Sequence, residues 1–156
     1  MKEKKALVFF ILLIIAVQLS GSYFTFSSIQ DWYPTLIKPF WNPPKWVFAP
    51  VWTILYLSIA VSGWLVFIQS TQLSKKAAFR WYGAQLFFNF LWSYLFFYLR
   101  CPLLGLVDIF LLIIALYATL HSFYSISKKA SLLLVPYFVW VLYAASLNLG
   151  IYILNR

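Results

Sequence analysis

The chain has 156 residues, of which 64% are hydrophobic and only 10% are charged. Soluble domains hold about 45–50% apolar residues, so a chain this short could not hide that much apolar surface from water, and we expect lipid to be its solvent. The formal net charge of +9 therefore indicates membrane topology and contact with anionic headgroups, and we expect no nucleic-acid partner.

Uncharged runs divide the sequence into five apolar stretches. A helix of about 20 residues crosses a hydrocarbon core about 30 Å thick, and each stretch is long enough to do so. The sequence therefore predicts an all-α fold, a single domain over residues 1–156 that forms an integral membrane bundle of five transmembrane helices. Short later links favour successive helices as antiparallel neighbours. The expected spans lie at about 6–26, 45–69, 80–99, 102–126 and 130–154.

The first stretch has a second interpretation. Three lysines precede an apolar run that reaches small residues at Ser20–Ser22, a pattern typical of a cleaved signal peptide. The apolar run continues to Phe26, which is long for a signal core. We therefore predict a retained first helix.

Basic residues in the short flanks predict the orientation. The positive-inside rule places the more basic side in the cytoplasm, so we expect a cytoplasmic N-terminus and an external first loop in a multi-pass protein of the cell membrane. Of the twelve Lys and Arg residues, one side holds Lys2, Lys4, Lys5, Lys75, Lys76, Arg80, Lys128 and Lys129, and the other holds Lys38, Lys45, Arg100 and Arg156.

The long first connection, at 27–44, opens the most distinctive stretch of the chain. Between Trp32 and Tyr56 lie four of the eight tryptophans and five of the seven prolines. The prolines prevent a regular helix over the first half and stiffen it. Aromatic residues at this density indicate either a membrane-interface belt or a pocket for a flat apolar ligand. Because the loop is too apolar for a solvated tether, we expect it to act as a lid.

The sequence offers no classical catalytic constellation. Three acidic residues, one His and one Cys cannot supply paired carboxylates, a local metal cluster or a set of haem ligands at a plausible site. We expect no metal site and no tightly bound cofactor. Whether the chain is an enzyme stays open.

Asp108 is the acidic residue inside a predicted span. An intramembrane carboxylate is a functional candidate by default, but this one lies about two turns into its helix, near the polar boundary. There Arg100 or a loop amide could pair with it. We favour this structural role.

Polar and aromatic side chains recur at helical spacing on three spans. Gln85, Asn89 and Ser93 share one face of the third span, and in lipid that face must turn inward. They either join helices through hydrogen bonds worth about 0.6 kcal/mol each or bind polar groups of a ligand, and the residues leave both roles open.

Two tryptophans lie well inside their spans, unlike the usual interfacial anchors. Trp52 shares a face with Tyr56 on the second span. Trp140 shares a face with Ala144, Leu147 and Asn148 on the fifth, where the alanine leaves room beside a large ring.

Several separate motifs, in order along the chain, carry a resemblance to a known family. They are WYPTLIKPFWNPPKWVFAPVWTILY at 32–56, NFLWSYLFF from Asn89, the pair Val107–Asp108, and PYFVWVLYAASLN at 136–148. The chain closely resembles bacterial-type members of the TspO/translocator protein family, also called tryptophan-rich sensory proteins or peripheral benzodiazepine receptors. The resemblance implies a five-helix bundle whose first loop closes over a cavity.

The resemblance also implies the ligands and the residues that bind them. It implies binding of porphyrins, especially protoporphyrin IX as ligand or substrate, and of benzodiazepine-type and isoquinoline ligands, with light- and oxygen-dependent porphyrin degradation in some members. Because indole stacks on a macrocycle and can donate an electron to an excited porphyrin, we expect redox roles for Trp52 and Trp140. The expected ligand-binding residues are Tyr33, Pro43, Trp46, Trp52, Tyr56, Asn89, Phe90, Ser93, Trp140, Ala144 and Leu147.

Two alternative functions belong to other classes. One is transport of tetrapyrroles or other lipophilic molecules, although five helices lack the inverted repeats and paired broken helices of common carriers. The other is a ligand-responsive stress sensor that acts through a partner protein.

Self-association and sterol binding are further expectations. The family resemblance implies a homodimer, and Ser58 and Ser62 form a weak small-xxx-small pair on the second span. Leu149, Tyr152 and Arg156 fit a loose sterol-binding pattern, but we interpret the last two first as an interfacial anchor.

Overall fold

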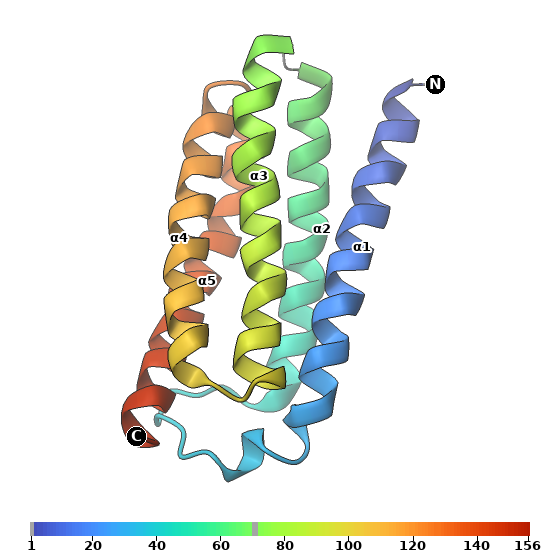
Figure 1. Cartoon of the computed structure of the whole chain (residues 1–156). Coiled ribbons are helices and arrows are strands. Elements are labelled where there is room, and N and C mark those ends of the chain that lie inside the picture. Colours follow the sequence, from blue (N-terminus) through green and yellow to red (C-terminus); the bar gives the residue numbers. More distant parts are fainter. Residues whose placement is uncertain (1, 70–71) are drawn as a thin grey trace.

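The computed structural model describes residues 2–69 and 72–156, and this part of the chain forms five long helices and no strand. The all-α prediction is confirmed. Figure 1 shows the helices side by side in one bundle, with the N-terminus at one end and the C-terminus at the other. The helices are α1 Lys2–Ile29, α2 Lys45–Gln69, α3 Gln72–Ser93, α4 Pro102–Tyr124 and α5 Lys128–Leu154.

Four of the described helices, α1, α2, α4 and α5, are long and apolar enough to cross a membrane. The remaining helix, α3, starts earlier than expected, and its first turns carry Lys75, Lys76 and Arg80, which lower its mean hydropathy. Its apolar part packs along α4. The composition and the bundle together describe a membrane protein.

Helix packing differs from the chain order at one place. α5 packs against both α2 and α4, and α3 packs against α4, as short links predict. α2 and α3, however, make little backbone contact, because aromatic side chains fill the space between them. The hydroxyl of Tyr82 on α3 crosses this space and donates to the Ile59 carbonyl oxygen on α2, 3.0 Å away.

The end of α3 widens into a π-helical turn, Tyr94–Tyr98, before Arg100 takes a left-handed backbone conformation with φ of 52° and ends the helix. A π turn leaves carbonyl groups without their usual partners. Here the Ser28 hydroxyl donates to the Phe97 carbonyl oxygen at 2.7 Å, which ties the end of α1 to this turn. Pro102 then occupies the first turn of α4, where its missing N–H is not needed.

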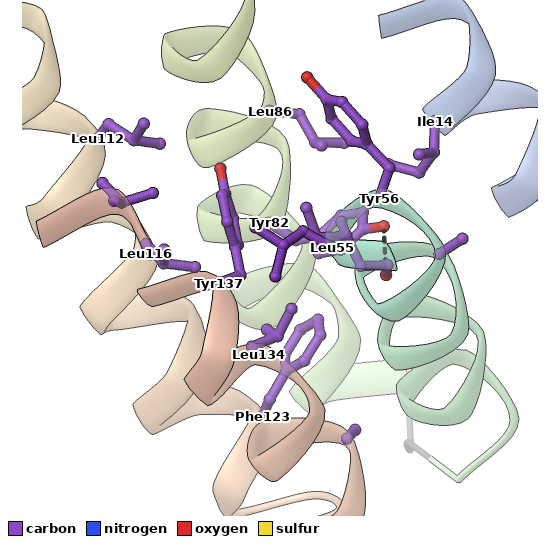
Figure 2. Close-up of a cluster of buried hydrophobic side chains, with 14 of the residues drawn as sticks. Ile14, Leu55, Tyr56, Tyr82, Leu86, Leu112, Leu116, Phe123, Leu134 and Tyr137 are labelled. Atoms are coloured by element: carbon purple, nitrogen blue, oxygen red, sulfur yellow. Dashed lines mark hydrogen bonds between the residues drawn. The ribbon is translucent and has the colours of Figure 1, made fainter. Parts of the chain in front are cut away.

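The hydrophobic core fills the bundle on the side of the α4–α5 link. Figure 2 shows side chains from all five helices converging there, among them Ile14, Tyr82, Leu116 and Leu134. Leu116 and Leu134 are fully buried, as is Phe123. This half of the bundle is therefore closed by packed side chains.

The long connection between α1 and α2 runs across the opposite end of the bundle (Figure 1). It contains one short 3₁₀ turn, Tyr33–Thr35, and otherwise no regular structure. α1 continues to Ile29, so the irregular segment covers residues 30–44, which is shorter than the 27–44 expected from sequence. The loop lies against the last turns of α5.

Candidate ligand cavity

A cavity of about 490 Å³ lies inside the bundle, between the first loop and the core. All five helices, the π turn and Tyr33 of the loop contribute to its wall. Its volume is within the range of about 300–1,000 Å³ that small-molecule sites occupy. The cavity is therefore large enough for an organic ligand.

Three hydrogen-bonded side chains from three helices form the inner end of the cavity. The Tyr56 hydroxyl on α2 donates to Asn89 Oδ1 on α3 at 2.8 Å, and Asn89 Nδ2 donates to the Tyr137 hydroxyl on α5 at 2.9 Å. Tyr56 and Asn89 also line the cavity. Asn89 thus joins three helices through hydrogen bonds, which is one of the two roles that the sequence left open, and it also lies in the cavity wall.

Aromatic rings cover much of the cavity wall. The Trp52 ring stacks on Tyr56 with centroids 5.3 Å apart, and the Trp140 ring makes an edge contact with Phe48 at 6.0 Å. The π turn adds Phe96, which stacks on Trp92 at 5.0 Å. Trp92 is fixed in turn, because its indole N–H donates to Asn148 Oδ1 at 3.0 Å. These rings give the cavity flat and rigid apolar surfaces.

Polar contacts hold the first loop across the cavity's outer end. The Tyr143 hydroxyl on α5 donates to the Trp41 carbonyl oxygen at 2.7 Å, and the Tyr33 hydroxyl donates to Asn42 Oδ1 at 3.0 Å within the loop. Tyr33 is buried, and this burial raises the pKa of its hydroxyl above the ordinary value. The loop is therefore packed onto the bundle as a lid.

Charge is sparse in and around the cavity. Among the described residues that line it, Lys45 alone is charged, at the start of α2 where the lid ends.

Asp108 lies behind the wall, 2% exposed, and both its carboxylate oxygens lack a hydrogen-bond partner among the described residues. The expected pairing with Arg100 or a loop amide is wrong: neither donates to Asp108 among the described residues, and the Arg100 side chain donates through Nε to the Ser28 hydroxyl at 3.4 Å instead. The amide of buried Gln85 is likewise without a partner among the described residues.

Comparison with known proteins agrees with this architecture. The TspO/MBR family model matches residues 10–154, almost the whole chain. The chain belongs to the TspO/MBR family. It is 45% identical over 149 residues to the tryptophan-rich protein TspO of Archaeoglobus fulgidus, with 96% of each chain covered. It is also similar to the tryptophan-rich sensory protein of Cereibacter sphaeroides, at 36% identity with 76% of this chain and 73% of the relative covered, and to the human translocator protein, at 36% identity with 82% and 77% covered.

The structure brings together most of the residues that the sequence singled out in this TspO/MBR chain. Those that line the cavity are Tyr33, Trp52, Tyr56, Asn89, Ser93, Trp140, Ala144 and Leu147. Trp52 and Trp140 face the same space from α2 and α5, but among the described residues no ring contact joins the two indoles. Each packs on its own partners instead, and Trp52 also meets Tyr137 at 6.2 Å.

Three expected site residues lie elsewhere. Trp46 is 73% exposed on the first turn of α2, and neither it nor Pro43 is part of the cavity wall. Phe90 points to the other side of α3, where it makes an edge contact with Phe24 of α1 and lines a separate outer groove. Its neighbour Asn89 faces inward because adjacent residues on a helix point about 100° apart.

The structure adds cavity residues that the sequence analysis did not name. On α1, Gln18, Ser22 and Thr25 line the cavity at i, i+4 and i+7, a helical polar stripe that could have been recognised from sequence. Trp92 and Phe96 follow Asn89 at i+3 and i+7, so their spacing also predicts the same face. Phe97 lies at i+8 from Asn89, which the same helical spacing also places on this face.

Proposed function

We propose that this TspO/MBR protein binds tetrapyrroles, protoporphyrin IX in particular, and flat apolar molecules of the benzodiazepine and isoquinoline classes in this cavity. The observation that carries the proposal is the placement of two indole rings, Trp52 and Trp140, in the wall of one lidded cavity. A flat conjugated ligand gains most from flat aromatic walls, with a few polar groups to orient it. Asn89 and Tyr56 are polar groups of this kind at the inner end.

Lys45 supports a ligand that carries carboxylates. Protoporphyrin IX is an apolar macrocycle with two propionate groups on one edge. With the macrocycle between the aromatic walls and that edge toward the lid, Lys45 would attract the propionates.

We further propose that the bound porphyrin is degraded in light and oxygen. An indole of Trp52 or Trp140 donates one electron to the excited macrocycle, and the reduced macrocycle passes that electron to molecular oxygen. The oxidised indole then takes an electron from the macrocycle and returns to its resting state. The net result is one-electron oxidation of the porphyrin and one-electron reduction of oxygen, which starts ring breakdown.

Titration of protoporphyrin IX into the full chain in detergent micelles tests binding and degradation separately. In the dark, we expect saturable quenching of tryptophan fluorescence and a shifted porphyrin absorbance. In light and air, we expect the porphyrin absorbance to decay faster than with the Trp52→Phe/Trp140→Phe double variant. Trp81→Phe, on the exposed surface of α3, is the matched control. Binding with unchanged decay in the double variant would remove the redox role and leave the binding role in place.

The role of Lys45 has its own test. Lys45→Gln should weaken protoporphyrin IX binding by about fivefold to tenfold, the effect of losing one partly solvated charge contact, and leave binding of the uncharged dimethyl ester unchanged. Lys38→Gln, whose side chain instead donates to the Leu36 carbonyl oxygen in the loop, is the control. Equal weakening for acid and ester would contradict the proposed pose.

The cavity is closed at its inner end, and this favours binding over transport. Beyond Tyr56 and Asn89 the bundle is filled by buried side chains such as Ile59, Phe123 and Leu134. A transported molecule would need these side chains to move. Time-dependent uptake of protoporphyrin into proteoliposomes, blocked by a competing ligand, would favour transport instead.

A further inference from the structure

A second hollow, of about 540 Å³, opens on the outside of the bundle between α1 and α3. It lies on the opposite face of α3 from the ligand cavity, and Phe90, rather than Asn89, belongs to it. Its wall is apolar: Phe9 on α1, Phe67 on α2 and Phe87 on α3 line it and are each at least 41% exposed. In a bilayer this outer groove faces lipid.

Gly83 leaves the floor of the outer groove open. A Cβ atom built on Gly83 would meet no heavy atom within 4 Å, in contrast to the other four glycines of the chain. Along α1 the groove runs from Phe9 to Val17, about 12 Å at the helical rise. The hollow therefore extends over about two turns of α1, and no described side chain fills it at Gly83.

One end of the outer groove is basic. On α3, Lys76 lies seven residues before Gly83 and Arg80 lies three residues before it, so both share its face of the helix. Both side chains are exposed. Lys5 stands four residues before Phe9 on α1 in the same way. Lys75 Nζ lies 4.5 Å from the centre of the Phe67 ring, directly at the groove wall.

We propose that the outer groove is a binding site for an anionic phospholipid. One acyl chain lies along the groove over Gly83, and the phosphate of the headgroup sits among Lys5, Lys76 and Arg80. Cationic residues at the membrane surface attract anionic headgroups by about 1 kcal/mol each, and the apolar groove below them accepts the chain. The pairing of an apolar channel with cations at one end matches an anionic lipid along its whole length.

The shape of the groove favours a lipid chain over a helix of a second copy. Helices that associate in lipid approach closely through small residues on both surfaces. Here bulky rings, among them Phe9, Phe87 and Phe90, line the hollow. A flexible acyl chain fills such a hollow, whereas a helix would meet the rings at the rim.

Native mass spectrometry of the full chain, released from micelles that contain equal amounts of dioleoyl phosphatidylglycerol and dioleoyl phosphatidylcholine, tests the site. We expect the wild-type protein to retain the anionic lipid in preference. Lys76→Gln/Arg80→Gln should lower that preference by about tenfold or more, from the loss of two charges. Lys128→Gln/Lys129→Gln removes two exposed charges from the start of α5, away from the groove, and should leave the preference unchanged.

Gly83→Leu tests the channel itself. The new side chain enters open space, so folding should persist, which a thermal unfolding curve checks, and the bound-lipid signal should fall for both lipids. Ile114→Phe, which adds bulk on the lipid-facing side of α4, is the matched control. Equal retention of the two lipids by the wild type, or unchanged retention in a folded Gly83→Leu, would overturn the proposal. A Gly83→Leu variant that turns from dimer to monomer with lipid retention intact would assign the groove to a second copy.

Discussion

Asn155 holds the backbone of Ile37 through a pair of hydrogen bonds. Its Oδ1 accepts from the Ile37 N–H and its Nδ2 donates to the Ile37 carbonyl oxygen, each at 2.9 Å. Two residues later, Pro39 packs on Gly150, where an added Cβ would come within 3.0 Å of the proline ring. The last turns of α5 therefore hold the lid in place over the cavity.

Replacing Asn155 should loosen the lid without disturbing the cavity wall. Asn155→Ala removes two exposed hydrogen bonds worth about 0.5–1.5 kcal/mol each, so we expect protoporphyrin IX to dissociate about tenfold faster. Stopped-flow recovery of tryptophan fluorescence measures the rate. Ser20→Ala, which removes only an exposed bond to the Ala16 carbonyl within α1, is the control. An unchanged dissociation rate would mean that ligand leaves by another route.

The Tyr33 hydroxyl makes the lid sensitive to alkaline pH. Burial raises the Tyr33 pKa above its ordinary 10.0, so the unfolded chain loses this proton more readily than the folded one. The stabilisation from Tyr33 is therefore complete below pH 10 and is lost as the pH rises through the raised pKa. Thermal unfolding from about pH 8 to about pH 11 should show a steeper loss for the wild type than for Tyr33→Phe. Parallel curves for the two proteins would contradict this role.

Much of the fold follows from the sequence, because in lipid the length of an uncharged run nearly determines a helix. The inward face of α3 was predictable too, since Asn89 and Ser93 are polar residues that cannot face lipid at a span centre. The π turn at Tyr94–Tyr98 was not predictable, because no residue pattern in the sequence indicates it. The sequence could not tell that Trp46 lies outside the cavity wall, because a tryptophan at the first turn of a helix, beside prolines, is equally compatible with the interface and with the cavity.

The environment of Asp108 also lay beyond the sequence. Its distance from the start of α4 predicted a boundary position with a nearby cation, but the approach of neighbouring helices buries it, and Arg100 turns toward Ser28 at the end of α1. Which of two possible partners a side chain takes is decided by packing between helices distant in sequence. Residue spacing along one helix carries no information on that choice.

The Asn89 hydrogen bonds should make this residue more costly to replace than either of its partners. Asn89→Ala leaves the Tyr56 hydroxyl without its acceptor and removes the donor to Tyr137, so we expect a loss of about 2–3 kcal/mol from two unpaired buried groups. Tyr56→Phe removes one hydroxyl and should cost about 1 kcal/mol. Chemical unfolding of the detergent-solubilised variants measures both. A smaller loss for Asn89→Ala than for Tyr56→Phe would show that Asn89 does not bridge the helices.

Replacing Gly63 and Gly83 by alanine should change the free energy of unfolding in opposite directions. A Cβ on Gly63 would lie 2.8 Å from the Tyr82 ring and 2.9 Å from the Phe10 ring, and both rings are buried between α1, α2 and α3. Because these rings cannot retreat without breaking the bond from Tyr82 to Ile59, Gly63→Ala should destabilise the protein by about 1–3 kcal/mol. Gly83→Ala meets open space and should stabilise α3 by up to about 1 kcal/mol, because alanine favours helix. Thermal unfolding of the two variants side by side measures the difference, and shifts of the same sign would contradict the packing of α2 against α3 through Tyr82.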